Sequence, residues 1–426
     1  MRRYESYKDS GVEWLGEVPS HWESFPLFVQ AKISSITNHI DKELLSVYLD
    51  RGVVRFSDVD EKRTNVTSLD LSKYQLVRKG NLVLNNQQAW RGSVGVSSYE
   101  GIVSPAYLIL ELSNKFDPHY ANYLFRNSSM VSHYLIASKG VGTIQRNLYW
   151  GNLRRTPIFI PPLSEQQKIA QFLDDKTAKI GQAVDLAEKQ ITLLKEHKQI
   201  LIQNAVTRGL NPDVPLKDSS VEWIGQVPEH WDVKKLKFVS KINQHTLPEN
   251  TNGSLSIKYV DIGSVSFENG IEKVENFSFK NAPSRARRLA NKGDIVVSTV
   301  RTYLKAITMV KEEYQDCIFS TGFAVVTSNE CLKDSFFELY AKSDAFTEQV
   351  SVFSKGMSYP AINSTDLSNL WITVPPLSEQ QKIADYLDTQ TAKIDQAIAL
   401  KTAHIEKLKE YKSVLINDVV TGKVRV

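Results

Sequence analysis

Two segments of this chain are near copies of each other, and this internal repeat constrains the fold more than any other feature. Residues 161–207 and 375–421 both begin Pro-Pro-Leu-Ser-Glu-Gln-Gln-Lys-Ile-Ala and, aligned at an offset of 214, are identical at 28 of 47 positions. A second pair, at 12–22 and 221–231, shares the form Val-Glu-Trp-(Leu/Ile)-Gly-x-Val-Pro-x-His-Trp. The 426 residues therefore form a duplicated unit of about 210 residues.

Weaker similarities lie between these two pairs. Lys79-Gly80 resembles Lys292-Gly293 at an offset of 213, and Ser138-Lys-Gly matches Ser354-Lys-Gly at 216. Such a drift is expected when one fold carries small loop insertions. Most other residues differ between the copies, so the two halves share a framework and differ in content.

The segment after each Pro-Pro is predicted to be a helix. Ser164 and Ser378 precede Gln167 and Gln381 by three residues, which is the spacing of a capping box. The preceding prolines disfavour helix upstream.

Each of these segments continues as one long helix. Apolar positions recur every three or four residues from Leu173 to Ala205 and from Leu387 to Val419. A pattern of this length predicts a long helix that packs on another long helix, and the two copies are natural partners. Gly209 and Gly422 are expected to end them. About 30 packed residues would span roughly 45 Å, somewhat more than one turn of B-DNA.

The remaining regions contain short apolar runs separated by Gly and Asn, such as 81–84, 107–110, 294–297 and 323–326, and helical patterns near 118–137 and 333–353. The predicted fold is α+β, with two homologous globular domains separated by two long antiparallel helices that form a coiled coil with pseudo-twofold symmetry. The predicted domains are 1–160 (first globular domain), 161–209 (first long helix), 210–374 (second globular domain) and 375–426 (second long helix).

The repeat also makes a prediction about the termini. Residues 221–231 directly follow the first long helix, whereas their copy, residues 12–22, lies near the N-terminus. Under the pseudo-twofold, residues 12–22 should pack near the end of the second helix, close to Val426. The chain is therefore expected to be nearly circular.

Composition excludes several classes of protein. No stretch of about 18 apolar residues is present, so no membrane span is expected. The first residues lack the apolar core of a signal peptide, and Cys317 and Cys331 are the only cysteines, so we expect a cytoplasmic protein without a disulfide framework or a Cys-rich zinc site. The net charge of +4 does not distinguish a DNA-binding protein from any other.

No catalytic motif is recognisable. The sequence lacks a P-loop, His-Glu-x-x-His, and the Asn/Asp-Pro-Pro-aromatic element of amino-methyltransferases. Asp185 with Glu196-His-Lys198 resembles a nuclease motif, and Glu410-Tyr-Lys412 repeats the triplet. Side chains two apart on a helix point roughly 200° away from each other, so these triplets are interpreted as structural.

The paired motifs, Pro-Pro-Leu-Ser-Glu-Gln-Gln-Lys-Ile-Ala and Val-Glu-Trp-(Leu/Ile)-Gly-x-Val-Pro-x-His-Trp, resemble those of the specificity (S) subunits of Type I restriction-modification systems, over the full chain. The resemblance implies two target-recognition domains, each contacting one half of a bipartite target in double-stranded DNA. It implies that the helices set the spacer and bind two methyltransferase (M) subunits, which restriction (R) subunits join. S-adenosylmethionine and ATP would then bind the partner subunits, and this chain would carry no cofactor and no catalysis of its own.

Candidate DNA-binding residues lie in a polar loop that follows a strand at the same repeat position in each domain. Asn and Gln can pair with adenine and Arg with guanine, and residues that differ between copies suit two different half-sites. The alternative is a solvated hairpin. In the first domain the candidates are Asn85, Asn86, Gln87, Gln88 and Arg91, and in the second Thr299, Arg301, Tyr303 and Lys305.

A second candidate is the loop that begins Ser-Lys-Gly in each domain, where glycines would allow close approach of the backbone to a phosphate. A simple turn between helix and strand fits equally well. Its candidates are Lys139, Gln145, Arg146, Lys355 and Tyr359. A basic run in the second domain, Arg285, Arg287 and Arg288, could contact phosphate or simply be solvated.

The repeated Trp14, Trp22, Trp223 and Trp231 are expected to pack each domain against the helices rather than to stack on bases. The Glu-Gln-Gln-Lys-Ile-Ala surfaces are candidate docks for the two M subunits. An alternative function remains, that of a coiled-coil scaffold whose globular domains bind a protein or a carbohydrate.

Overall fold

The computed structural model describes residues 2–13, 15–59, 70–141 and 145–426, with the side chains of Val141 and Gln145 outside the description. The chain divides into two compact units. The first comprises residues 1–187 and 403–426, and the second residues 188–402. Each unit thus contains one globular part together with a portion of each long helix.

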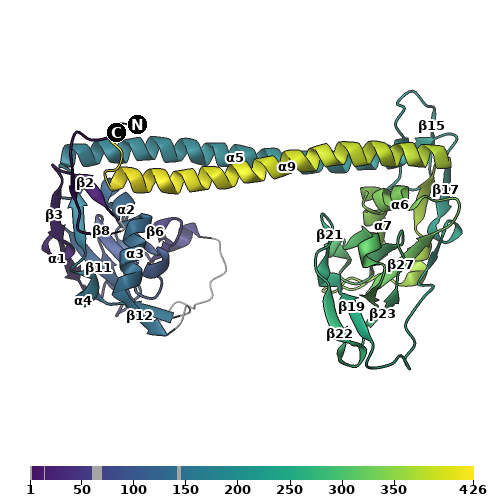
Figure 1. Ribbon diagram of the computed structural model, residues 1–426, viewed down its shortest axis with the longest axis horizontal. Helices are drawn as coiled ribbons and strands as arrows, with labels where there is room; N and C mark the ends of the chain where they lie inside the picture. The colour runs from purple at the N-terminus through teal and green to yellow at the C-terminus, as the bar shows by residue number, and fades with distance from the viewer. Residues whose placement is uncertain (1, 14, 60–69, 142–144) are drawn as a thin grey trace. The chain divides into compact units, whose positions relative to one another are not determined.

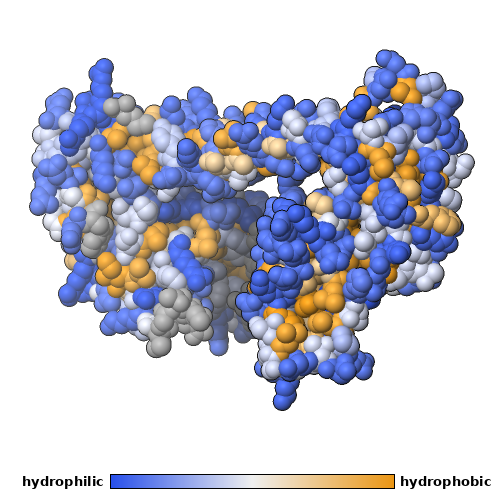
Figure 2. All heavy atoms as spheres, turned by 45° about the vertical axis from the view of Figure 1, so that its right-hand side comes forward, coloured by the Kyte–Doolittle hydropathy of each residue, from blue (hydrophilic) through white to orange (hydrophobic). Residues whose placement is uncertain are grey.

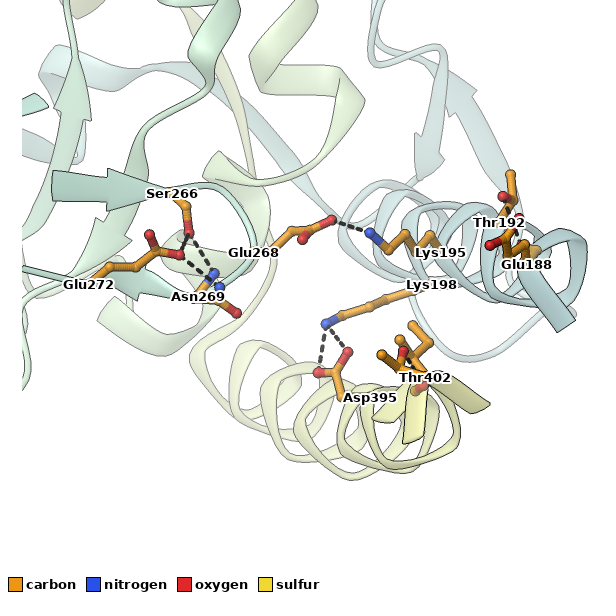
Figure 3. Close-up of polar contacts among 11 residues, drawn as sticks. Glu188, Thr192, Lys195, Lys198, Ser266, Glu268, Asn269, Glu272, Asp395 and Thr402 are labelled. Carbon is orange, nitrogen blue, oxygen red and sulfur yellow. Dashed lines mark hydrogen bonds and ion pairs between the residues drawn. The ribbon is translucent and has the colours of Figure 1, made fainter. Parts of the chain in front are cut away.

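The long helices are α5 (Leu163–Arg208) and α9 (Leu377–Val420). Within the second unit, Lys198 Nζ lies 2.7 Å from Asp395 Oδ1, and Lys401 Nζ donates to Gln190 Oε1 at 2.6 Å. Residue numbers therefore rise along α5 in the direction in which they fall along α9. The two helices are antiparallel, as predicted (Figures 1 and 3).

The predicted capping boxes at the helix starts are wrong. Helix α5 already begins at Leu163, and the backbone N–H groups of Glu165 and Gln166 both donate to the carbonyl of Pro162, at 2.9 and 3.0 Å. Ser164 therefore lies inside the first turn. The same pattern recurs at Pro376 at the start of α9.

The predicted glycine stops are confirmed. Gly209 and Gly422 follow the two helices, and both have φ of +78°, a conformation that glycine adopts without strain. A Cβ on Gly209 would lie 3.2 Å from the Trp231 ring, and one on Gly422 would lie 3.1 Å from the Trp22 ring. Each helix end is therefore in close contact with a repeated tryptophan.

The centre of each globular part is a four-stranded antiparallel sheet of the same order. In the first unit it is β4 (Ala31–Ser34), β11 (Tyr107–Leu112), β8 (Asn81–Asn85) and β9 (Val94–Val96). In the second it is β18 (Ser240–Ile242), β27 (Phe323–Ser328), β24 (Ile295–Ser298) and β25 (Ile307–Met309).

Two helices follow this sheet in each unit. They are α2 (Pro118–Arg126) and α3 (Ser128–Ala137) in the first, and α6 (Asp334–Ala341) and α7 (Asp344–Phe353) in the second. Each helical pattern in the sequence is thus split in two. Between α2 and α3, Asn127 ends one helix and begins the next, since its side chain accepts the N–H of Met130.

A second group of strands differs between the units. The second unit has a four-stranded sheet of β22 (Glu275–Ser278), β19 (Ser256–Val260), β26 (Cys317–Ser320) and β23 (Ala286–Leu289). The described part of the first unit has the pairs β5 (Leu45–Tyr48) with β6 (Gly52–Arg55), and β7 (Gln75–Val77) with β10 (Gly101–Val103).

Shorter elements complete each unit. In the first they are β1 (Tyr7–Asp9), β2 (Glu17–Pro19), β3 (Glu23–Pro26), α1 (Leu27–Gln30), β12 (Ser138–Val141), β13 (Gln145–Leu148), α4 (Trp150–Leu153) and β14 (Pro157–Ile160). In the second they are β15 (Leu216–Asp218), β16 (Gln226–Pro228), β17 (Asp232–Lys235), β20 (Val265–Ser266), β21 (Gly270–Ile271), α8 (Ser364–Ser368) and β28 (Trp371–Val374).

The core of each unit includes residues of the long helices. In the first unit Leu173 of α5 and Val419 of α9 belong to the same buried cluster as Trp22 and Phe125. In the second, Ile202 and Leu387 share a cluster with Trp231. The globular parts are therefore packed onto the helices, not merely attached to them.

The chain ends lie together in the first unit (Figure 1). Arg2 and Arg425 form an antiparallel bridge, in which Arg425 N donates to Arg2 O at 2.9 Å. The predicted near-circular path is confirmed.

The surface is mostly hydrophilic in the view of Figure 2, with apolar side chains emerging among polar ones along the long helices. Leu193, Ile200 and Leu400 are 62%, 58% and 65% exposed. Within the described ranges, no helix is both long enough and apolar enough to cross a membrane.

Candidate nucleic-acid interface

The repeated His-Trp pair fixes each globular part to the start of a long helix. In the first unit Trp22 Nε1 donates to Glu165 Oε1 at 3.2 Å, and His21 Nε2 lies 2.9 Å from Glu165 Oε2. The second unit repeats both contacts, at 2.9 Å from Trp231 and 2.8 Å from His230 to Glu379. The predicted packing role of these tryptophans is confirmed, while Trp14 lies outside the described residues.

A buried glutamine beside each of these glutamates completes the junction. The Gln166 side chain donates to the carbonyls of Pro161 and Lys115 and accepts the N–H of Asp117, all at 2.9 Å. Gln380 makes the same three bonds in the second unit. The Glu-Gln-Gln-Lys-Ile-Ala motif therefore mainly makes contacts within the protein, between the globular part and the long helix. Only its second Gln and its Lys are exposed.

The polar loop of the first unit follows β8 and is tightly folded. Asn85 Oδ1 accepts the N–H of Gln87 at 3.1 Å, and Trp90 Nε1 donates to Gln87 O at 2.9 Å. Asn86 accepts the N–H of Leu148 through its carbonyl, at 2.9 Å. The side chains of Gln87 and Arg91 are exposed, and those of Asn85, Asn86 and Gln88 are half-buried.

The bond to Leu148 brings the β12–β13 hairpin, which carries the Ser-Lys-Gly sequence, against this loop. The Arg91 guanidinium lies 4.6 Å from the Trp90 ring centroid, and that of Arg146 lies 5.8 Å from the same ring. Lys139 lies 5.7 Å from the ring of Tyr149. The two candidate loops thus form one cationic and aromatic surface. The side chain of Gln145 lies outside the described residues.

The second unit joins the corresponding two loops. Thr302 and Ser354 are linked through their hydroxyls at 2.9 Å, and Val300 and Lys355 both form β-bridges with Ala361. The Arg301 guanidinium lies 5.5 Å from the ring of Tyr359. An arginine over an aromatic ring therefore recurs in both units, although the ring comes from a different loop in each and only Tyr359 is exposed.

Backbone strain marks the loop of the second unit. Arg301 and Lys305, with φ of 52° and 47°, flank a short turn in which Tyr303 is 61% exposed. Left-handed conformations are uncommon for residues other than glycine and concentrate at functional sites.

Not every candidate in this loop points outward. The hydroxyl of Thr299 donates to Gly322 O at 2.9 Å, and Lys305 Nζ donates to Thr347 Oγ1 at 3.1 Å. Lys355 is 85% exposed and lies 3.9 Å from a carboxylate oxygen of Asp366. The Thr299 hydroxyl and the Lys305 amino group therefore already have hydrogen-bond partners within the protein.

In the basic run of the second unit, Arg287 and Arg288 lie on β23 and Arg285 immediately precedes it. Arg285 is exposed. Arg287 covers the ring of Phe279 at 4.6 Å, and Arg288 Nη1 donates to Thr246 Oγ1 at 3.4 Å. Burial lowers the pKa of Arg288.

Two aromatic members of this interface, Trp90 and Tyr149, were not among the candidates taken from the sequence, whereas Tyr303 and Tyr359 were. Trp90 and Tyr149 hold the cations of the first unit, and the side chain of Met357, next to the Tyr359 loop, is fully exposed. The sequence Gln88-Ala-Trp-Arg91 places a tryptophan in a polar loop, and this feature could have identified Trp90 as a candidate.

Among the described residues no group of three His, Cys, Asp or Glu side chains could hold a metal ion. Lys198, from one of the nuclease-like triplets, forms an ion pair with Asp395 (Figure 3).

Comparison with known proteins identifies the family. The model of the Type I restriction modification DNA specificity domain matches residues 36–189 and again 228–410. The chain belongs to this family and is a DNA specificity subunit of the type I restriction-modification class.

Among its relatives is the type I restriction enzyme MjaVIII specificity subunit of Methanocaldococcus jannaschii, 26% identical over 432 residues, covering 96% of this chain and 94% of the relative. The EcoKI specificity subunit of Escherichia coli K12 is 22% identical over 207 residues, 47% of this chain and 44% of that protein.

Solved structures share the fold. A chain from a study of complex assembly and conformational transition of the type I R-M system aligns with a TM-score of 0.72 at 18% identity, covering 96% of this chain and 99% of that one. The HsdS subunit from Thermoanaerobacter tengcongensis aligns with a TM-score of 0.57 at 18% identity, covering 98% and 100%. The scaffold alternative is not favoured by these matches.

Proposed function

We propose that each globular domain contacts one half of a bipartite DNA target through its paired loops, and that the long helices set the spacer between the halves. The observation that carries this proposal is the recurrence, in the paired loops of each domain, of an arginine over an aromatic ring: Arg91 and Arg146 at the half-buried Trp90, and Arg301 at the exposed Tyr359. Guanidinium groups are the commonest specific partners of guanine, and aromatic rings can contact bases.

We further propose that this chain performs no chemistry itself and directs two methyltransferase subunits, which hold S-adenosylmethionine. Restriction subunits, which hold ATP, would join the complex in the cytoplasm. Exposed apolar positions on the long helices support such docking, since Ile200 and Val414 occupy the same repeat position and are 58% and 50% exposed. The exposed Gln167 and Lys168, with Gln381 and Lys382, would flank the docks.

Mapping of methylated adenines in cells that carry the chain with its methyltransferase partner tests the proposal. We expect a bipartite motif with a fixed gap. Arg146→Ala should relax one half of that motif and Arg301→Ala only the other, each weakening discrimination by about 10- to 100-fold. Lys311→Ala, at an exposed position after β25, serves as a control and should leave both halves intact. A motif in which both variants relax the same half would contradict the assignment.

Binding assays test the partners. Duplex binding should require the methyltransferase subunit and should weaken steeply with salt. The mass of the purified complex should correspond to two methyltransferase subunits per chain, and a mass corresponding to one would rule out two equivalent docks.

A further inference from the structure

A pocket of about 580 Å³ lies in the first unit between the globular part and the long helices. Its wall is formed by α2, by the turn between β5 and β6, by the turns before β8 and after β9, and by α5 and α9. The polar side chains that matter below are those of Lys79, Asn122, Arg126, Asp174 and Lys412. Small-molecule sites typically have volumes of about 300–1,000 Å³.

The second unit has the same local framework, so the two can be compared position by position. Val96 N donates to Asn122 Oδ1 at 3.1 Å in the first unit, and Met309 N donates to Glu338 Oε1 at 3.4 Å in the second. The N–H of Gly80 and that of Gly293 each donate to a carbonyl of the strand turn opposite, at 2.8 and 2.9 Å. Asn122 therefore corresponds to Glu338, and Lys79 to Lys292.

In the second unit, three cations of this region are each paired with a carboxylate. Lys198 lies 2.7 Å from Asp395 (Figure 3), Lys342 lies 2.9 Å from Glu338, and Lys292 lies 2.8 Å from Glu312. Burial, and after it Glu338 and Asp385, raise the pKa of Asp388 on the adjoining face of α9. In this region of the second unit, carboxylates of the protein therefore neutralise the three cations.

In the first unit the corresponding cations, Lys412, Arg126 and Lys79, have lost these partners. Gly181 stands in place of Asp395 and Asn122 in place of Glu338. Glu312 belongs to a turn that is longer than its counterpart in the first unit, so it has no equivalent. Across the described residues, no carboxylate forms an ion pair with any of the three cations.

The carboxylates that do line the pocket are engaged with other groups. Asp174 Oδ1 accepts the hydroxyl of Tyr123 at 2.7 Å, and Asp50 Oδ2 lies 3.5 Å from Arg51 Nε. Arg126 donates from Nη2 to the carbonyls of Leu49 and Asp50, at 3.2 and 2.6 Å, and its buried Nε has no partner. A buried N–H left unpaired is costly, and an anion in the pocket would satisfy it.

We propose that this pocket binds a small organic phosphate of nucleotide size, held by Arg126, Lys412 and Lys79. The exposed ring of His119 and the ring of Tyr123 would flank the remainder of the molecule. Such a ligand joins α2 of the recognition domain to α5 and α9 and so stabilises the first unit. The second unit does not bind it, because its carboxylates occupy the equivalent cations.

Isothermal titration of the full chain with ADP and with pyrophosphate, with adenosine as the uncharged probe, tests this proposal. We expect one site per chain for both phosphates and none for adenosine. Gly181→Asp introduces the carboxylate of the second unit, and Gly181→Ala is its matched control. A Cβ at position 181 meets nothing within 4 Å, so both variants fit the structure. The aspartate should weaken phosphate binding by about tenfold or more, and the alanine should leave it unchanged.

Three results would overturn the proposal: no heat from either phosphate at millimolar concentration, equal affinities in the Asp and Ala variants, or a loss of duplex DNA affinity in Gly181→Asp without any phosphate binding to the original chain. The last result would assign the three cations to the DNA backbone. None of these results bears on the half-site assignment, which depends on Arg146 and Arg301.

Discussion

At the scale of single residues, the junction between domain and helix depends on two adjacent side chains. The carboxylate of Glu165 contacts Trp22 and His21, and the side chain of Gln166 bonds three backbone groups, those of Pro161, Lys115 and Asp117. Tyr4 also donates to Glu165 at 2.7 Å, and burial followed by Glu165 raises the pKa of this tyrosine. The identity of Glu-Gln in both copies is thus explained by hydrogen bonding.

Replacement of the buried glutamine should be costly. Gln166→Ala leaves two carbonyls and one N–H unpaired, and we expect the free energy of unfolding of the first unit to fall by about 3 kcal/mol. Urea denaturation measures this change. Gln167→Ala, at the exposed neighbour, is the control and should change it by less than about 0.5 kcal/mol. Equal losses in the two variants would show that the three bonds contribute little.

A second residue makes the first unit sensitive to acid. Burial lowers the pKa of His133 on α3 below its ordinary 6.5. As the pH falls through that value, the unfolded chain takes up the proton before the folded one does, so stability is complete above about pH 6.5 and is lost below it. The loss of stability between pH 7 and about 5, followed by thermal unfolding, should be smaller in His133→Gln. The exposed control His119→Gln should keep the original profile.

At the scale of elements, the sequence predicts the long helices well and the sheets less well. The helices follow from an apolar spacing that continues from Leu173 to Ala205, and their glycine ends were placed correctly. The capping box failed because Pro162 and Pro376, two residues before the expected Ser164 and Ser378, accept the first helical N–H groups. Strand order was not predictable, since pairing partners such as β4 and β11 are far apart in sequence.

The candidate interface was predictable in place but not in detail. Both loops of each domain were located by their position in the repeat. Tertiary packing, which the sequence does not reveal, determines the contact through Asn86 and Leu148 and the inward bonds of Thr299 and Lys305. Tyr359 was a candidate from the sequence, but its contact with Arg301 and the part played by Trp90 could be recognised only from the structure.

The helix ends allow a test of packing. Gly422→Ala would combine a positive φ with a Cβ only 2.3 Å from Pro19 Cδ, whereas Gly16→Ala has a similar φ of +68° and nothing within 4 Å. We expect the first to lower the free energy of unfolding by about 2–3 kcal/mol and the second by about 1 kcal/mol. Thermal unfolding of both variants decides this, and equal shifts would mean that Pro19 moves aside freely.

At the scale of the whole molecule, duplication makes the path of the chain close on itself. In the second unit, residues after α5 run directly into the segment that carries Trp231. In the first unit, the end of α9 meets the equivalent segment, with Trp22, through non-covalent contacts alone. The first unit has the bridge between Arg2 and Arg425 at the place where the second unit has a continuous chain. The junctions at Trp22 and Trp231 thus differ in connectivity more than in packing.

A circular permutant follows from this equivalence. The gap between the ends in the first unit can be closed by a short Gly-Ser linker after Val426, and new ends can be opened between Asn211 and Pro212, where the chain is exposed. We expect this permutant to unfold within about 1 kcal/mol of the original and to direct methylation to the same bipartite motif. A chain opened between Leu110 and Glu111, inside the central strand β11, is the control and should not fold, because it breaks the strand that pairs with both β4 and β8. The permutant opened at Asn211 could also fail to fold. That result would show that the covalent link after α5 is necessary for the second unit, and that the non-covalent contacts at Trp22 are no substitute for such a link.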